Sequence, residues 1–176
     1  IRGCGMDCEF CTVKGKPRFA SPERMLESIS TIMETHEVER FFVVDDLFGQ
    51  QRDETIRVCR MLSEYQKSIG KNLRITVQIR LDKANDSELM SAMREAGIDN
   101  VAIGFESPIE EELRVMKKKL KAQDMIALSR KFHDAGFLVH GMFIFGYPLA
   151  DDISYAMPIS ERIKQYRTFI KKAKID

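Results

Sequence analysis

Three cysteines near the start of the chain have a spacing that could bind a soft metal. Cys4, Cys8 and Cys11 form a C-x₃-C-x₂-C run on a short stretch that contains glycine, and Phe10 directly precedes the last cysteine. Thiolates are preferred ligands of zinc and of iron–sulfur clusters, and four of them close a structural site. Three leave one coordination position open, as a catalytic centre requires. The run therefore predicts a metal centre that can bind a further ligand.

A disulfide framework and a closed zinc site are the alternatives for these cysteines. A disulfide framework is disfavoured, because only 4 cysteines occur in 176 residues, three of them are close together, and no signal peptide is visible. A zinc site would need a fourth ligand, which Cys59 or one of the 3 histidines could supply. Cys59 lies on the apolar side of a predicted helix, which favours a buried small side chain over a ligand.

The composition is typical of one cytoplasmic enzyme domain that covers residues 1–176. With 44% hydrophobic and 31% charged residues the chain can bury one core, and a net charge of +1 gives no nucleic-acid signal. No apolar run approaches the roughly 20 residues of a membrane-spanning helix. Clustered thiols favour a reducing compartment, hence the cytoplasm. The chain starts at Ile1 and ends at Asp176 as if cut near strands, so we expect a core truncated at both ends.

Strands and helices are predicted to alternate along the chain. After the tail of a first strand at the N-terminus, short apolar or alternating runs predict strands over 41–44, 73–79, 101–105 and 138–145. Helical spacing and capping residues predict helices that begin near Ser21 and then span 53–69, 85–96, 109–116 with 124–135, and 159–172. We expect 41–44 to be buried on both faces. The alternation favours an α/β fold, a partial (β/α)₆ TIM-like open barrel with parallel strands.

Polar residues follow the predicted strands at the end where parallel α/β sheets bind ligands. The first strand runs into the cysteine loop, and the later strands end in Asp45 and Asp46, in Gln78 and Arg80, in Glu106, and in Ile144 with Gly146-Tyr147-Pro148. Each could have a purely structural role; Arg80, for example, can pair with Asp82. Because such residues recur at every strand end, a shared site is favoured.

The cysteine spacing and the order of these later residues resemble the radical S-adenosylmethionine (SAM) enzymes over nearly the whole chain. The resemblance implies that Cys4, Cys8 and Cys11 hold a [4Fe–4S] cluster and that SAM chelates the fourth iron. It also implies reductive cleavage of SAM to methionine and a 5′-deoxyadenosyl radical, which abstracts hydrogen from a substrate. No protein acid or base is needed to generate the radical.

The same resemblance suggests contacts to the amino-acid part of SAM. Asp45 and Asp46 stand where the family usually has a Gly-Gly-Glu-like motif that receives the SAM ammonium, and a carboxylate there can accept charge-assisted hydrogen bonds. Arg80 looks like a partner of the SAM carboxylate or of these acids. Gln78 could reach the ribose or the substrate.

Three further residues resemble contacts to the rest of SAM. Glu106 resembles the fourth-strand acid that contacts or orders the SAM site. Ile144 resembles the fifth-strand residue that packs on adenine, and Phe10 the aromatic whose backbone meets the adenine edge. In an apolar strand such residues are otherwise simply core.

The acid pair and Glu106-Ser107-Pro108 resemble enzymes that carry a cobalamin domain in front of the barrel. The resemblance therefore implies methyl transfer or tailoring of a small-molecule or lipid-like substrate, with cobalamin on a domain absent from this chain. It also implies an electron donor such as flavodoxin or ferredoxin. Two alternatives stay open, a non-catalytic zinc-binding α/β module and a methylthiolase-like core that modifies RNA.

Overall fold

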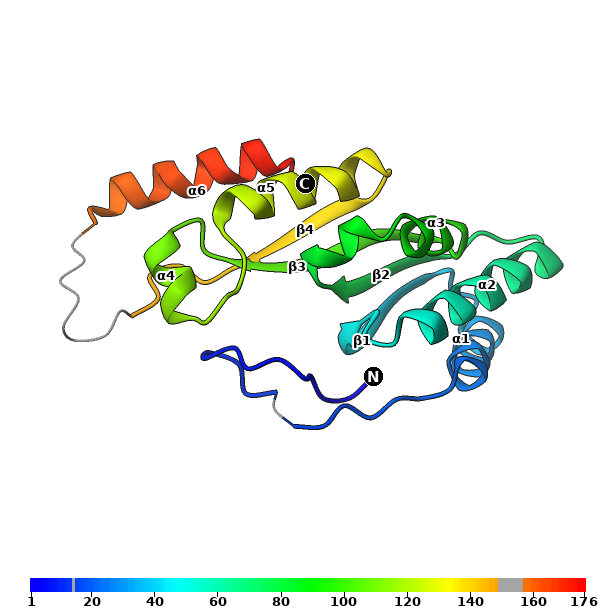
Figure 1. Cartoon of the computed structure of the whole chain (residues 1–176). Coiled ribbons are helices and arrows are strands. Elements are labelled where there is room, and N and C mark those ends of the chain that lie inside the picture. The colour runs from blue at the N-terminus through cyan, green and yellow to red at the C-terminus, as the bar shows by residue number, and fades with distance from the viewer. Residues whose placement is uncertain (14, 149–156) are drawn as a thin grey trace.

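The computed structural model describes residues 1–13, 15–148 and 157–176 (Figure 1). One open sheet of four parallel strands has the order β1-β2-β3-β4, with β1 Arg40–Phe48, β2 Arg74–Ile79, β3 Ile98–Glu106 and β4 Leu138–Phe143. The helices are α1 Pro22–His36, α2 Arg52–Ile69, α3 Ser87–Glu95, α4 Glu110–Val115, α5 Ala122–Asp134 and α6 Ile159–Ala173, with a 3₁₀ turn η1 at Leu81–Asn85. The predicted α/β fold with an open parallel sheet is confirmed.

The start of the chain differs from the prediction. Arg2 forms an isolated antiparallel bridge with Arg18, and no strand precedes β1 in the part of the chain that the structure describes. The first strand of the sheet is also longer than expected, so that Asp45 and Asp46 lie inside β1 rather than after it. The pairing of β1 with β2 becomes irregular between Val43 and Phe48, so the acids lie where regular pairing is interrupted.

Helix ends follow the expected chemistry of caps. The Ser21 side chain accepts a hydrogen bond from the Arg24 backbone N–H at 3.2 Å, and Pro22 takes the first helical position of α1. Helix α2 ends at Gly70, which has a φ of 65°, a left-handed conformation that glycine adopts without steric cost. Local sequence therefore fixes where these two helices begin and end.

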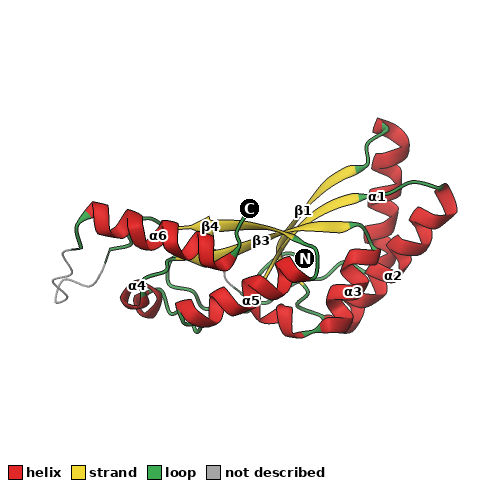
Figure 2. Cartoon of the chain, turned by 90° about the horizontal axis from the view of Figure 1, so that it is seen from above, coloured by secondary structure: helices red, strands yellow, loops and turns green. Residues whose placement is uncertain are grey.

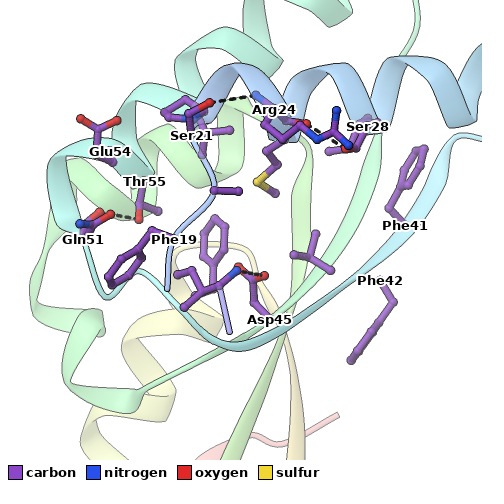
Figure 3. A pocket seen from close by; sticks show the side chains of 18 of the residues that line it. Phe19, Ser21, Arg24, Ser28, Phe41, Phe42, Asp45, Gln51, Glu54 and Thr55 are labelled. Atoms are coloured by element: carbon purple, nitrogen blue, oxygen red, sulfur yellow. Dashed lines mark hydrogen bonds and ion pairs between the residues drawn. The ribbon is translucent and has the colours of Figure 1, made fainter. Parts of the chain in front are cut away.

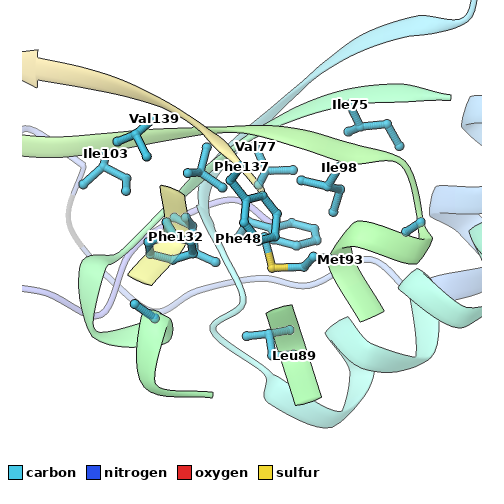
Figure 4. Close-up of a cluster of buried hydrophobic side chains, with 14 of the residues drawn as sticks. Phe48, Ile75, Val77, Leu89, Met93, Ile98, Ile103, Phe132, Phe137 and Val139 are labelled. Atoms are coloured by element: carbon cyan, nitrogen blue, oxygen red, sulfur yellow. The ribbon is translucent and has the colours of Figure 1, made fainter. Parts of the chain in front are cut away.

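Only one face of the sheet is covered by the described helices. Helices α2, α3 and α5 lie on one side of the strands (Figure 2), and the buried side chains of that side form one hydrophobic cluster, which includes Phe48, Val77, Met93, Phe132 and Phe137 (Figure 4).

The opposite face is open, and it contradicts one prediction. Phe42 and Val44 are 58% and 66% exposed, so the apolar run 41–44 is not buried on both faces. A run that is apolar at every position predicts a doubly covered strand only if a second layer exists, and the described residues put helices on one side.

Candidate active site

The base of the cysteine loop is fastened to the carboxyl end of β1. Arg2 and Arg18 exchange backbone hydrogen bonds of 3.0 and 2.7 Å, which close the loop that carries Cys4, Cys8 and Cys11. Gly3 has a φ of 90°, and a Cβ there would lie 3.2 Å from the Lys16 carbonyl oxygen. The glycine thus permits the close return of the chain that forms the base of the loop.

The two acids of β1 hold this base. Asp46 accepts a hydrogen bond of 2.6 Å from the Gly3 backbone N–H, and the Asp46 backbone N–H donates to the Ile1 carbonyl at 3.4 Å. The Ile1 nitrogen donates a hydrogen bond to the Asp45 carboxylate. The Gln50 side-chain amide donates to the Gly3 carbonyl at 3.3 Å. The acids predicted to receive the SAM ammonium therefore contact the segment that leads into Cys4.

The tip of the loop, which is drawn in dark blue in Figure 1, contacts segments that follow the other three strands. After β2, the Arg80 guanidinium touches the Met6 sulfur and also pairs with Asp82 at 3.1 Å. After β3 and α4, the Met116 carbonyl accepts a 3.3 Å hydrogen bond from the Glu9 backbone N–H. After β4, Tyr147 packs edge-on against Phe10 with ring centroids 6.5 Å apart. The cysteine loop thus lies across the ligand-binding edge of the sheet.

A salt bridge reinforces the contact after α4. The Lys117 ammonium lies 2.8 Å from a Glu9 carboxylate oxygen. This carboxylate raises the pKa of Lys117 above its usual value, first by its hydrogen bond and then by its charge. Lys117 was not singled out in the sequence, because it is one of three consecutive lysines that look alike.

Glu106 ends β3 in a strained turn. Its φ is 65°, and the Ser107 N–H donates to the Phe105 carbonyl at 2.9 Å, which makes a three-residue γ-turn centred on Glu106. Such a backbone costs about 1–3 kcal/mol for a residue other than glycine. The carboxylate, which is largely buried, forms an ion pair of 3.0 Å with Lys118. This ion pair is a structural contact of a residue that the sequence also placed at the shared site.

Glu106 and Ile144 are neighbours. The Ile144 backbone N–H donates to the Glu106 carbonyl at 2.7 Å, and the Tyr166 hydroxyl of α6 donates to the Ile144 carbonyl at 2.6 Å. Burial raises the pKa of Tyr166, which keeps its hydroxyl protonated as a donor. The structure therefore brings together Glu106 and Ile144, two residues predicted to contact SAM, and the Tyr166 hydroxyl of α6 stabilises the position of Ile144.

A buried polar network supports this corner. The Glu112 carboxylate is completely buried, accepts a hydrogen bond from the Ser107 hydroxyl and pairs with the Arg162 guanidinium. The Tyr166 hydroxyl lies 3.3 Å from the Ser107 oxygen. Helices α4 and α6 are thereby joined to the ends of β3 and β4. Sequence reasoning missed Glu112, Arg162 and Tyr166, because only the approach of α6 distinguishes them from exposed helical residues.

Gln78 lies in the open face rather than at the cysteine loop. In the pairing of β2, β3 and β4 it stands opposite Ala102, which in turn stands opposite His140. Thr76, Asn100 and Leu138 form the neighbouring row. The Asn100 side-chain oxygen is buried and has no hydrogen-bond partner in the described structure. Gln78 is therefore placed to reach a molecule on the open face.

The donor set of the loop fits an iron–sulfur cluster. All four cysteines lie in the described part of the chain and none forms a disulfide, while Cys4, Cys8 and Cys11 are half-buried. Cys8 and Cys11 share one turn, with Cys11 N–H donating to the Cys8 carbonyl at 3.3 Å. Across the described residues, no three His, Cys, Asp or Glu side chains lie close enough together to hold a single metal ion. A four-iron cluster does not require that, because each thiolate binds a different iron.

Cys59 lies inside the hydrophobic core, on helix α2. It is fully buried in the hydrophobic cluster, and burial raises the pKa of its thiol to about 12. The preference for a small buried side chain over a fourth ligand agrees with this position.

A separate pocket of about 310 Å³ lies between α1, β1 and α2 (Figure 3). Met25, Phe41 and Val58 give it mostly apolar walls. Asp45 is in its lining, whereas Asp46 is not. The two acids therefore differ in position, since Asp45 faces the pocket side of β1 and Asp46 contacts the cysteine loop at Gly3.

An open parallel α/β sheet with a cysteine loop across its carboxyl edge is an arrangement of the barrel type, in which ligands bind at the carboxyl ends of the strands. The family model of the radical SAM superfamily matches residues 1–153. The chain therefore belongs to the radical SAM superfamily and is an enzyme of that class. Membership implies a [4Fe–4S] cluster and SAM as cofactors.

Two relatives of the chain are methyltransferases by name. An uncharacterized methyltransferase of Synechocystis sp. is 31% identical over 151 residues, which cover 83% of this chain and 28% of that protein. Hopanoid C-2 methylase of Rhodopseudomonas palustris is 30% identical over 120 residues, or 66% of this chain and 23% of that protein. The chain thus spans about a quarter of the length of these relatives.

Solved structures agree on the fold. The radical SAM methyltransferase TsrM from Kitasatospora setae superposes with a TM-score of 0.74 at 17% identity, covering 95% of this chain and 32% of that one. The cobalamin-dependent SAM radical enzyme OxsB gives 0.75 at 19% identity, covering 96% and 25%. None of the described helices combines the length and apolar character needed to cross a membrane.

Proposed function

We propose that this chain is the catalytic core of a radical SAM enzyme that takes part in methyl transfer or a related tailoring reaction. The observation that carries the proposal is the cysteine loop, which contacts the carboxyl end of β1 and the segments that follow β2, α4 and β4. When bound, the reduced cluster supplies the electron that cleaves SAM to methionine and a 5′-deoxyadenosyl radical, which abstracts hydrogen from the substrate. Cys4, Cys8 and Cys11 would hold the cluster.

The protein's own charges would orient SAM. Asp46, next to the loop, can accept hydrogen bonds from the SAM ammonium, and Arg80 can pair with its carboxylate. Glu106 and Ile144, joined by a backbone hydrogen bond, would face the adenosine part together with Phe10. Asp45, the neighbour of Asp46 on β1, would contribute a second carboxylate near the SAM ammonium.

An apolar, small-molecule or lipid-like substrate suits the open face of the sheet. Phe42, Val44 and Leu138 expose large apolar surfaces there, and Gln78 and His140 offer isolated polar contacts. The hopanoid methylase among the relatives acts, by its name, on such a molecule. Pockets for apolar ligands usually combine these features, apolar walls with few polar groups.

The remaining components are proposed from the class of reaction. Cobalamin would sit on a domain outside this core, and the structural neighbour OxsB is a cobalamin-dependent enzyme by name. A flavodoxin or ferredoxin would supply the electron. Four cysteines without disulfides support the cytoplasm as the compartment.

The test compares two cysteine variants after anaerobic reconstitution with iron and sulfide. Cys8→Ala should lose the broad visible absorption of the cluster and the formation of 5′-deoxyadenosine from SAM. Cys59→Ala removes a buried thiol and is the matched control, so it should keep both. Absorption before and after dithionite, iron content and mass spectrometry of the products are the measurements.

Two outcomes would overturn the proposal. A colourless protein that retains one zinc would favour the zinc-binding module, and a Cys8→Ala variant with full iron content and SAM cleavage would refute the ligand assignment. Sulfur insertion into RNA instead of methyl transfer would favour the methylthiolase-like alternative. That alternative also has a relative, a methylthiotransferase by name that is 26% identical over 171 residues.

A further inference from the structure

We propose that Lys118 is a positioning residue of the SAM site, because its ammonium holds the Glu106 carboxylate at the end of β3. The inference rests on the proposed function and deepens it. Lys118 binds one carboxylate oxygen, Oε1, at 3.0 Å. The second oxygen is the acceptor that we assign to a hydroxyl group of the SAM ribose.

Burial distinguishes this ion pair from the adjacent pair Lys117–Glu9. The side chains of Lys118 and Glu106 are 19% and 11% exposed, whereas those of the adjacent pair Lys117–Glu9 are 60% and 51% exposed. An ion pair that is exposed to water contributes little to stability, whereas a largely desolvated carboxylate is stabilised mainly by its charged partner. Lys118 is therefore the partner that offsets the desolvation of the Glu106 carboxylate.

The backbone around Glu106 is built to aim the carboxylate. The strained γ-turn directs the side chain back over β3, and a Cβ on Gly104 would collide with Glu106 Oε1. That same Cβ would lie 3.6 Å from the Lys118 nitrogen. The glycine thus leaves the space in which the ion pair forms. Strain of this kind persists only where the surrounding contacts determine it, and it concentrates at functional sites.

The position of Lys118 is itself tied to the cysteine loop. Its backbone N–H donates to the Leu113 carbonyl at 2.8 Å at the end of α4. The two preceding residues contact the loop, Met116 through its carbonyl and Lys117 through its ammonium, both with Glu9. The turn 116–118 therefore joins Glu106 to the segment between Cys8 and Cys11. It fixes the position of the Glu106 carboxylate relative to the cysteines.

The experiment measures SAM binding by isothermal titration to the chain with its reconstituted cluster. Lys118→Met removes the charge and keeps the length, and it should weaken SAM binding at least tenfold. Lys118→Arg should stay within threefold of the wild type, because a guanidinium can replace the ammonium. Lys119→Met, at the exposed neighbouring lysine, is the matched control and should bind as the wild type does.

Iron content and cluster absorption separate positioning from a structural role, since both should be unchanged in Lys118→Met at a temperature where the variant is folded, although the loss of a buried partner lowers its melting temperature. The double variant Lys118→Met with Glu106→Gln should bind SAM no more weakly than either single variant. If Lys118→Met does not fold, Lys118→Gln replaces it in the same measurements of SAM binding and iron content. Wild-type affinity in both neutral variants, or a parallel loss of iron, would overturn the inference. A wild-type chain that neither binds nor cleaves SAM would instead refute the proposed function.

Discussion

The buried pair between Glu112 and Arg162 allows a sharp prediction about stability. Replacing Arg162 by leucine would leave a carboxylate that is fully buried with only the Ser107 hydroxyl as a partner. Removing one member of a buried ion pair costs about 3–5 kcal/mol. That is a large part of the roughly 5–15 kcal/mol by which a domain is stable. The urea midpoint should fall by roughly 2 M if the denaturant slope is about 2 kcal/mol/M.

The measurement is urea unfolding followed by circular dichroism under reducing conditions. Arg60→Leu is the matched control, because Arg60 forms an exposed pair of 3.0 Å with Glu88 and its loss should cost at most about 1 kcal/mol. The double variant Glu112→Leu with Arg162→Leu should regain most of the lost stability, since no buried charge is left unpaired. The reasoning is refuted if Arg162→Leu lowers the unfolding free energy no more than Arg60→Leu does. It is also refuted if the double variant loses the sum of what Glu112→Leu and Arg162→Leu lose separately.

Three further predictions concern single positions. In the folded, reduced and cluster-free protein at pH 8, iodoacetamide should label three thiols and spare the buried Cys59. Because burial raises the pKa of Cys59 from 9.0 to about 12, the stability that its neutral thiol contributes should also decline as the pH rises through that interval. Four labels without denaturant would contradict this. Ser21→Ala removes the N-cap of α1 and should lower the unfolding free energy by about 1 kcal/mol, measured by urea unfolding. Gly97→Ala should prevent soluble expression at 37 °C, because a Cβ would collide with the Leu73 carbonyl at a φ of 81°; a stable, soluble variant would show that the turn can relax.

Much of the architecture could be predicted from local patterns. Alternation in 73–79, the cap at Ser21 and the left-handed stop at Gly70 are short-range features, and the structure confirms the elements that they indicate. The apolar run 41–44 misled, because the same residues suit a strand covered on both faces and a strand with one face toward a ligand. Only the placement of the helices decides between them.

The supporting residues of the site could not be predicted, because their roles arise from distant contacts. Glu112 stands beside Glu110 and Glu111, and nothing in the sequence separates the three. Arg162, which lies fifty positions later in the sequence, pairs with Glu112 in the folded protein. Lys118 likewise cannot be distinguished from its two lysine neighbours in the sequence. It differs from them in the fold, because it forms an ion pair with Glu106 in the turn that ends β3. A motif fixes which residues can do the chemistry, whereas the tertiary fold fixes which residues hold them.

The contacts of the cysteine loop have a consequence for how the protein assembles. Glu9 meets Met116, and Phe10 meets Tyr147, so each contact joins residues separated by more than half of the chain. Pairings of such separation form late, since the intervening segment must be ordered first. The three thiols therefore emerge before the strands that hold them and reach their final arrangement last. During synthesis they are exposed to oxidation or to the wrong metal until β4 has joined the sheet.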